Sequence, residues 1–121
     1  MRPLALIVAT PEPERLRGAL TLAAAQAALG GAATLFLQLD AVALLRPPLG
    51  APQDAAHRAA GLPDLAALMD EARAIGVRLL ACQSGLALAG LVAADLPPGA
   101  EAAGPVALLQ DLPDDARLLF V

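Results

Sequence analysis

The strongest constraint on the fold of this chain is a series of short apolar runs separated by segments with helical periodicity. Residues 4–9, 33–39 and 77–81 consist mainly of apolar side chains. Short runs of this kind are typical of strands that are buried on both faces, as in parallel sheets. These runs therefore predict three strands and a parallel sheet at the centre of the molecule.

Helical segments lie between the expected strands. Residues 14–29 carry apolar side chains along one helical face, and a glycine pair follows them. A second helix is expected from Leu62, with Pro63 in its first turn and Gly76 at its end. We also expect a helical turn at 41–45, helices at 85–93 and 105–112, and strands at 100–103 and 117–121.

The alternation of strands and helices predicts the fold class. Such alternation produces right-handed βαβ units and a parallel sheet that is covered on both sides. We therefore predict an α/β fold, a three-layer α/β/α sandwich with a mainly parallel five-stranded sheet. The 121 residues suit one domain, 1–121. An irregular loop is expected at about 46–61, and loops of this length are usually functional or disordered.

Charge and hydropathy argue against two classes of partner. The net charge is −4, and the eight arginines are scattered and outnumbered by acidic residues. Proteins that bind nucleic acid need clustered positive charge, so we expect none as a main partner. The apolar stretches 19–39 and 79–94 are interrupted by polar residues and glycine, which argues against a membrane span. The first apolar run is too short for a signal peptide, so we expect a cytoplasmic protein.

Cys82 is the most distinctive residue chemically. It follows the third strand and precedes a helix that Ser84 is placed to cap. Ligands of parallel sheets bind beyond the carboxyl ends of the strands. Free N–H groups and the helix dipole at such a position favour a thiolate, which is the nucleophilic form of sulfur. The alternative is that Cys82 is a small buried side chain, because free cysteine is among the most buried residue types.

Other polar residues are expected at the same edge of the sheet. The candidates for ligand binding there are Thr10, Asp40, Gln83 and Ser84. For Asp40, capping of the turn after the second strand is the simpler role. His57 lies in the expected loop, where it is either a partner for Cys82 or, more simply, a solvated side chain.

Motifs for cofactors and metals do not occur in the sequence. The first strand is not followed by a glycine-rich phosphate loop, and the chain carries neither a Walker motif nor a Gly-x-Ser-x-Gly elbow. One cysteine and one histidine 25 positions apart do not form a structural zinc site. We therefore expect no cofactor and no metal.

With these residues placed, the chain resembles the DsrE/DsrF-like family of sulfur-trafficking proteins over nearly its whole length. The resemblance includes the first strand with its alanine-rich helix, and residues 33–40. It is sharpest over 62–77 and in the segment Leu80-Ala81-Cys82-Gln83-Ser84. The helix after Gly104 and the strand at 118–121 also match the family.

The resemblance implies a fold, an assembly and an activity. Members have a parallel sheet between helices and commonly form trimers or hexamers, so it implies a homo-oligomer. Active members hold transferable sulfur as a cysteine persulfide, a role that falls on Cys82 alone in this chain. It further implies sulfur donor and acceptor proteins as partners.

Two functional hypotheses follow. In the first, the Cys82 thiolate accepts sulfane sulfur and passes it to an acceptor thiol, as a sulfurtransferase-like sulfur carrier. In the second, the protein is a non-catalytic oligomeric subunit or a small-ligand-binding module, and Cys82 is structural. A peroxidatic role is weaker, because the chain has no second cysteine to resolve a sulfenic acid.

Overall fold

A five-stranded sheet forms the centre of the molecule. The computed structural model describes all of residues 1–121. The strand order is β4-β3-β2-β1-β5, and every neighbouring pair is parallel. This architecture confirms the predicted α/β fold with a parallel sheet. The strands are β1 (Leu4–Val8), β2 (Ala33–Leu37), β3 (Arg78–Cys82), β4 (Glu101–Ala103) and β5 (Arg117–Phe120).

The apolar runs form the three inner strands because both of their faces are buried. All five residues of β1 are buried, and so are most residues of β2 and β3. Leu6 lies beside Leu35, and Phe36 lies beside Leu80 in the next pair of strands. Burial of leucine and phenylalanine side chains contributes roughly 1.5–3 kcal/mol each. The inner strands are therefore the core from which the rest of the fold is built.

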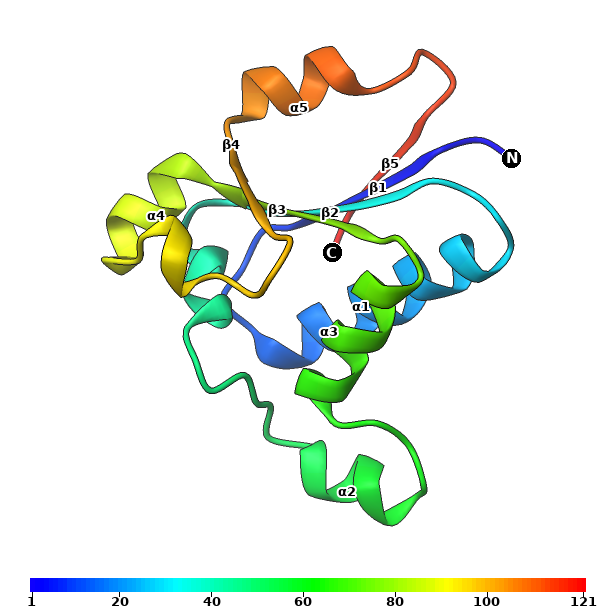
Figure 1. Cartoon of the computed structure of the whole chain (residues 1–121), viewed down its shortest axis with the longest axis vertical. Helices are drawn as coiled ribbons and strands as arrows, with labels where there is room; N and C mark the ends of the chain where they lie inside the picture. Colours follow the sequence, from blue (N-terminus) through cyan, green and yellow to red (C-terminus); the bar gives the residue numbers. More distant parts are fainter.

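Helices cover the two faces of the sheet unequally. The long helix α1 (Pro13–Ala28) and α3 (Leu65–Ala74) pack together below the sheet, whereas the short helix α5 (Pro105–Asp111) lies alone above it (Figure 1). Only Leu108 of α5 is buried. None of the helices has the length and apolar character to cross a membrane.

Short helices follow the strands at their carboxyl edge. The 3-10 helix η1 (Leu39–Leu45) follows β2, and α4 (Gln83–Ala89) follows β3. These two elements lie side by side (Figure 1). A second 3-10 helix, η2 (Ala93–Asp95), leads towards β4. The Arg46 guanidinium donates to the carbonyl oxygen of Ala89 and so joins the end of η1 to the end of α4.

Two helix starts differ from the sequence prediction. Helix α3 begins at Leu65, because the Asp64 side chain accepts a hydrogen bond from the Ala67 N–H at 2.9 Å and caps the helix. Pro63 therefore precedes the cap instead of lying in the first turn. Helix α4 begins at Gln83, so Ser84 lies inside its first turn and does not cap it. This helix ends at Ala89, because Gly90 adopts the left-handed conformation.

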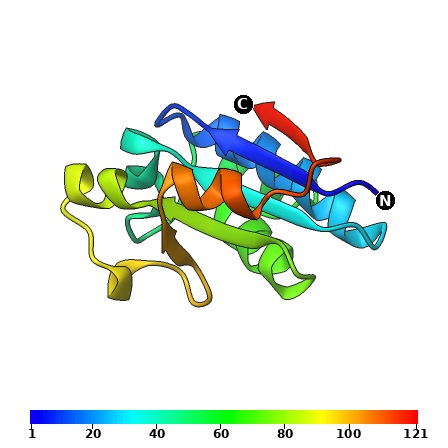
Figure 2. The same ribbon diagram turned by 90° about the horizontal axis from the view of Figure 1, so that it is seen from above.

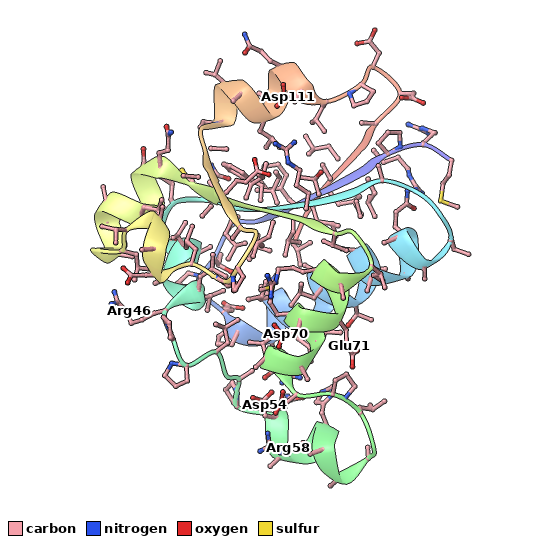
Figure 3. The ribbon with its side chains drawn as sticks, viewed as in Figure 1. Arg46, Asp54, Arg58, Asp70, Glu71 and Asp111 are labelled. Atoms are coloured by element: carbon pink, nitrogen blue, oxygen red, sulfur yellow. The ribbon has the colours of Figure 1, made fainter.

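The segment 46–61 is more ordered than expected, because it contains the helix α2 (Asp54–Ala59). No residue of this helix is buried, so the segment lacks the periodic apolar face that predicts a helix from sequence. A partly buried polar network holds it instead. Arg17 of α1 donates to Asp54 at 2.6 Å and to Glu14 at 2.8 Å. The Asp54 carboxylate also accepts from the Leu65 N–H at 3.0 Å, which ties α2 to the start of α3 (Figure 3).

The network predicts acid sensitivity. The hydrogen bond from Arg17 lowers the pKa of Asp54 from its ordinary value of 3.8 to about 2. A carboxylate with a lowered pKa stabilises the fold above its unfolded-state pKa, and this stabilisation is lost as the pH falls through the folded-state value. We expect the free energy of unfolding to fall between about pH 4 and pH 2, and to fall less in Asp54→Asn. Urea titrations over this range measure both slopes, and equal slopes would contradict the prediction.

Candidate functional site

Cys82 lies where the third strand meets a helix. It is the last residue of β3 and the N-cap residue of α4. Its strand is flanked by β2 and β4, and Cys82 itself lies beside Ala103. The side chain is only 3 % exposed. The sulfur is thus at the carboxyl edge of the sheet, as predicted, but beneath the surface.

Polar groups lie near the sulfur. The backbones of Leu39, Gly85 and Ser84 and the Ser84 side chain are placed so that they act on the pKa of the Cys82 thiol. Burial raises the pKa of the Cys82 thiol, but these polar groups together lower it below the ordinary value of 9.0. The arrangement therefore makes the thiolate easier to form than it is in an ordinary cysteine, despite the burial.

One of these polar groups depends on an unusual backbone conformation. Leu39 has a φ of 51° and is the only non-glycine residue with a positive φ. Branched side chains rarely adopt this left-handed conformation, which costs about 1–3 kcal/mol. Leu39 is the first residue of η1, directly after Gln38 at the end of the extended segment. The turn here brings the Leu39 backbone near the sulfur of the neighbouring strand, where it lowers the pKa of the thiol.

Gly85 lets the two elements approach each other. A Cβ atom at this position would overlap the carbonyl oxygen of Leu39 and the side chain of Val42. Both of those residues belong to η1, so only glycine allows α4 to pack directly on the backbone of η1. We call this contact between η1 and the first turn of α4 the η1–α4 seam. The seam encloses the Cys82 sulfur.

Cys82 is almost fully enclosed in this structure. Five surface cavities are present, and Cys82 lines none of them. A thiol-transfer role requires a sulfur that is open to a reaction partner. Because η1 and α4 pack against each other next to Cys82, we expect the seam to open when a partner reaches the sulfur.

The other candidate residues lie at different depths. Gln83 and Ser84 are exposed in the first turn of α4, and Asp40 is exposed in η1, so these three lie on the two sides of the seam. Thr10 follows β1, and its hydroxyl oxygen is buried without a hydrogen-bond partner. His57 belongs to α2, near the Glu14 carboxylate, and is not among the groups that act on the pKa of the Cys82 thiol.

The comparisons with known proteins agree with this arrangement. The model of the DsrE/DsrF-like family matches residues 3–120. The chain belongs to the DsrE/DsrF-like family. The crystal structure of the ychN protein from E. coli has the same fold, with a TM-score of 0.70, 20 % sequence identity and complete coverage of both chains. A search of curated protein sequences finds no match.

Two contributors to the site of this DsrE/DsrF-like protein were not predicted. The position of the Leu39 backbone depends on a torsion that leucine does not signal in a sequence. Gly85 was readable in principle, because a glycine inside a short helix often marks a close backbone approach. Both contributors act through the backbone, so neither has a reactive side chain that would mark it in the sequence.

Gly85 provides a test of the seam. In Gly85→Ala, the added methyl group pushes η1 away from α4, so we expect a loss of about 1–3 kcal/mol in the free energy of unfolding. We also expect Cys82 to react faster with iodoacetamide. Chemical denaturation and labelling rates measure the two effects.

Gly18 is the matched control. It lies in the middle of α1, and a Cβ atom there would meet nothing within 4 Å. Gly18→Ala is therefore expected to leave labelling unchanged and to stabilise the protein by up to about 1 kcal/mol. A similar change in stability and labelling for both variants would show that the seam has no special role.

Proposed function

We propose that this protein is a sulfur carrier that holds sulfane sulfur as a persulfide on Cys82. The observation that supports the proposal is the position of Cys82 at the N-cap of α4, where the backbones of Leu39, Ser84 and Gly85 lower the pKa of its thiol. A buried structural cysteine needs no such polar groups, whereas a thiolate or a persulfide anion does. Membership of the DsrE/DsrF-like family, which is associated with sulfur relay, supports the same function.

The proposed chemistry is thiol exchange in two steps. In the first, the Cys82 thiolate attacks the outer sulfur of a donor persulfide. The new S–S bond forms at Cys82, the donor S–S bond breaks, and the electron pair leaves with the donor thiolate. In the second, an acceptor thiolate attacks the outer sulfur on Cys82 and regenerates the Cys82 thiolate. Neither step needs a cofactor.

The site residues have distinct roles in this proposal. The Leu39, Ser84 and Gly85 amides stabilise the sulfur anion. Gln83 and Ser84, which are exposed next to Cys82, meet the donor or acceptor protein first when the seam opens. We propose Thr10 and Asp40 as further ligand contacts at the same edge of the sheet, since each follows an inner strand.

Sulfur loading tests the carrier function. Wild-type protein treated with a low-molecular-weight persulfide is expected to gain the mass of one sulfur atom. Cys82→Ser, which is nearly isosteric, is expected to gain none. Intact-protein mass spectrometry with and without a reducing agent makes the measurement. If wild-type Cys82 resists both sulfur loading and alkylation until the protein is unfolded, the carrier proposal fails.

A second candidate function has its own support. Cys82 is 3 % exposed and lines no cavity, as expected for a cysteine that only fills space in the core. On this alternative the protein is a non-catalytic oligomeric subunit or a small-ligand-binding module. The sulfur-loading result separates the two candidates, because a structural cysteine stays unmodified in the native state.

We further propose that the protein acts in the cytoplasm as a homo-oligomer, either a trimer or a hexamer, with donor and acceptor proteins as partners. Many large apolar side chains are exposed, and small domains with such surfaces commonly associate. Among them are Val106, Leu109, Leu118, Leu119 and Phe120.

Light scattering on purified protein at micromolar concentration tests the assembly. We expect a mass that is a multiple of the 12.1 kDa chain. High salt is expected to leave the oligomer intact, because apolar contacts are not screened by ions. A monodisperse monomer would contradict the proposal.

A further inference from the structure

Strand β5 is an open edge of the sheet. It pairs with β1 on one side only, and no element lies beyond it (Figure 2). All four of its residues are exposed, including Leu119 at 43 % and Phe120 at 70 %. Soluble proteins usually protect such an edge with charged side chains, proline, a bulge or a covering loop. The one charged residue of β5, Arg117, donates to Gln26 of α1, and no such residue or feature protects 118–120.

The opposite edge of the sheet shows the usual protection. Strand β4 has only three residues, and the first of them is Glu101. Its carboxylate pairs with Arg78 at 3.0 Å and places charge on that edge. The two edges of one sheet therefore differ, and only β5 presents an apolar row of side chains with free backbone groups.

The hydrogen bonds to β1 show which backbone groups of β5 are free. The Arg117 N–H donates to Pro3 at 2.8 Å, and the Val121 N–H donates to Ile7 at 2.9 Å. Successive residues of a strand direct their backbone groups to opposite sides. Residues 117, 119 and 121 therefore face β1, whereas Leu118 and Phe120 direct their N–H and C=O groups outward.

The side chains of β5 alternate in the same way between the two faces of the sheet. Leu118 and Phe120 line a cavity of about 190 Å³ together with Leu109 of α5, so they lie on the α5 face. Arg117 donates to Gln26 of α1 at 2.9 Å, so it lies on the α1 face. Leu119 shares that face with Arg117, because strand residues alternate.

We infer that β5 pairs with β5 of a second copy of this chain, antiparallel across a two-fold axis. A two-fold axis at a sheet edge must be perpendicular to the sheet, so it reverses the strand and keeps the α5 faces together. Residues directly opposite in an antiparallel pair lie on the same face. Leu118 therefore lies opposite the partner's Phe120, and Leu119 lies opposite the partner's Leu119 on the axis.

This register also satisfies the free backbone groups. Leu118 and Phe120 carry the outward N–H and C=O groups. Leu118 therefore forms a hydrogen-bonded pair with the partner's Phe120, and Phe120 forms one with the partner's Leu118. The side-chain faces and the backbone directions both agree with this alignment, and among the registers that satisfy them it pairs the longest stretch of chain, from Arg117 to Val121. It brings no like charges together, because Arg117 is the only charged residue of β5.

This interface specifies one contact surface of the homo-oligomer proposed above, so it rests on that proposal. It is independent of the chemistry at Cys82. It is a two-fold contact, so it forms a dimer alone, and a hexamer only if a three-fold contact exists elsewhere. An oligomer held together through other surfaces would satisfy the light-scattering prediction and fail the test below.

Cysteine cross-linking tests the register, in a Cys82→Ser background that leaves one thiol per chain. At position 119 the two Cα atoms are expected about 4.5 Å apart, within the range of a disulfide. Oxidised glutathione should therefore convert Leu119→Cys into a covalent dimer of twice the chain mass. Leu118→Cys is the matched control, because its two copies lie about 7–8 Å apart on a diagonal and do not cross-link. No dimer for Leu119→Cys, or equal dimer for both variants, would overturn the inference.

Hydrogen exchange on the wild-type protein provides a test without a substitution. We expect the Leu118 and Phe120 amides to exchange more slowly as the protein concentration rises. Fast exchange at these two amides in a sample that is oligomeric by light scattering would overturn the inference. Protection that appears only when an extended peptide is added to a monomeric sample would also overturn it, since the edge would then serve a different partner.

Discussion

The parallel pairing of β2 with β3 is the constraint on which the candidate site depends. Because the two strands run in the same direction, the residues that follow them emerge at the same edge of the sheet. The start of η1 and the start of α4 are therefore neighbours, although more than forty positions separate Leu39 from Cys82 in the sequence. No side chain of either strand lowers the pKa of the Cys82 thiol. The groups that lower it are backbone groups of Leu39, Gly85 and Ser84, together with the Ser84 side chain, which the sheet topology brings together.

The site combines two opposing effects on one sulfur atom. Enclosure by η1 and α4 disfavours a negative charge, while the amides of Leu39, Ser84 and Gly85 favour it. The polar groups outweigh the burial, so the pKa of the thiol lies below its ordinary value although the residue is almost fully enclosed. If Cys82 carries sulfur as proposed, opening the seam would expose the reactive atom, and closing it would separate the bound sulfur from water and from competing thiols.

Most of the fold was readable from the sequence because the inner strands are buried on both faces. Their apolar runs predicted the strands, and the direction of β3 predicted that Cys82 lies at the carboxyl edge. Features without a burial signal were missed. Helix α2 buries no residue and is held by the Arg17–Asp54 ion pair, which joins positions 37 apart. The start of α3 depends on one hydrogen bond to Asp64, and the turn at Leu39 depends on a torsion that leucine rarely adopts.

The strand order has a consequence for how the chain folds during synthesis. Strands β1, β2, β3 and β4 leave the ribosome in the order in which they pair, so the sheet grows outward from β1 in one direction. Strand β5 pairs on the other side of β1 and emerges last. Until residues 117–120 have left the ribosome, that side of the first strand has no partner and exposes its backbone to other nascent chains. The open edge of β1 is therefore a surface of the nascent chain that needs protection until β5 pairs with it.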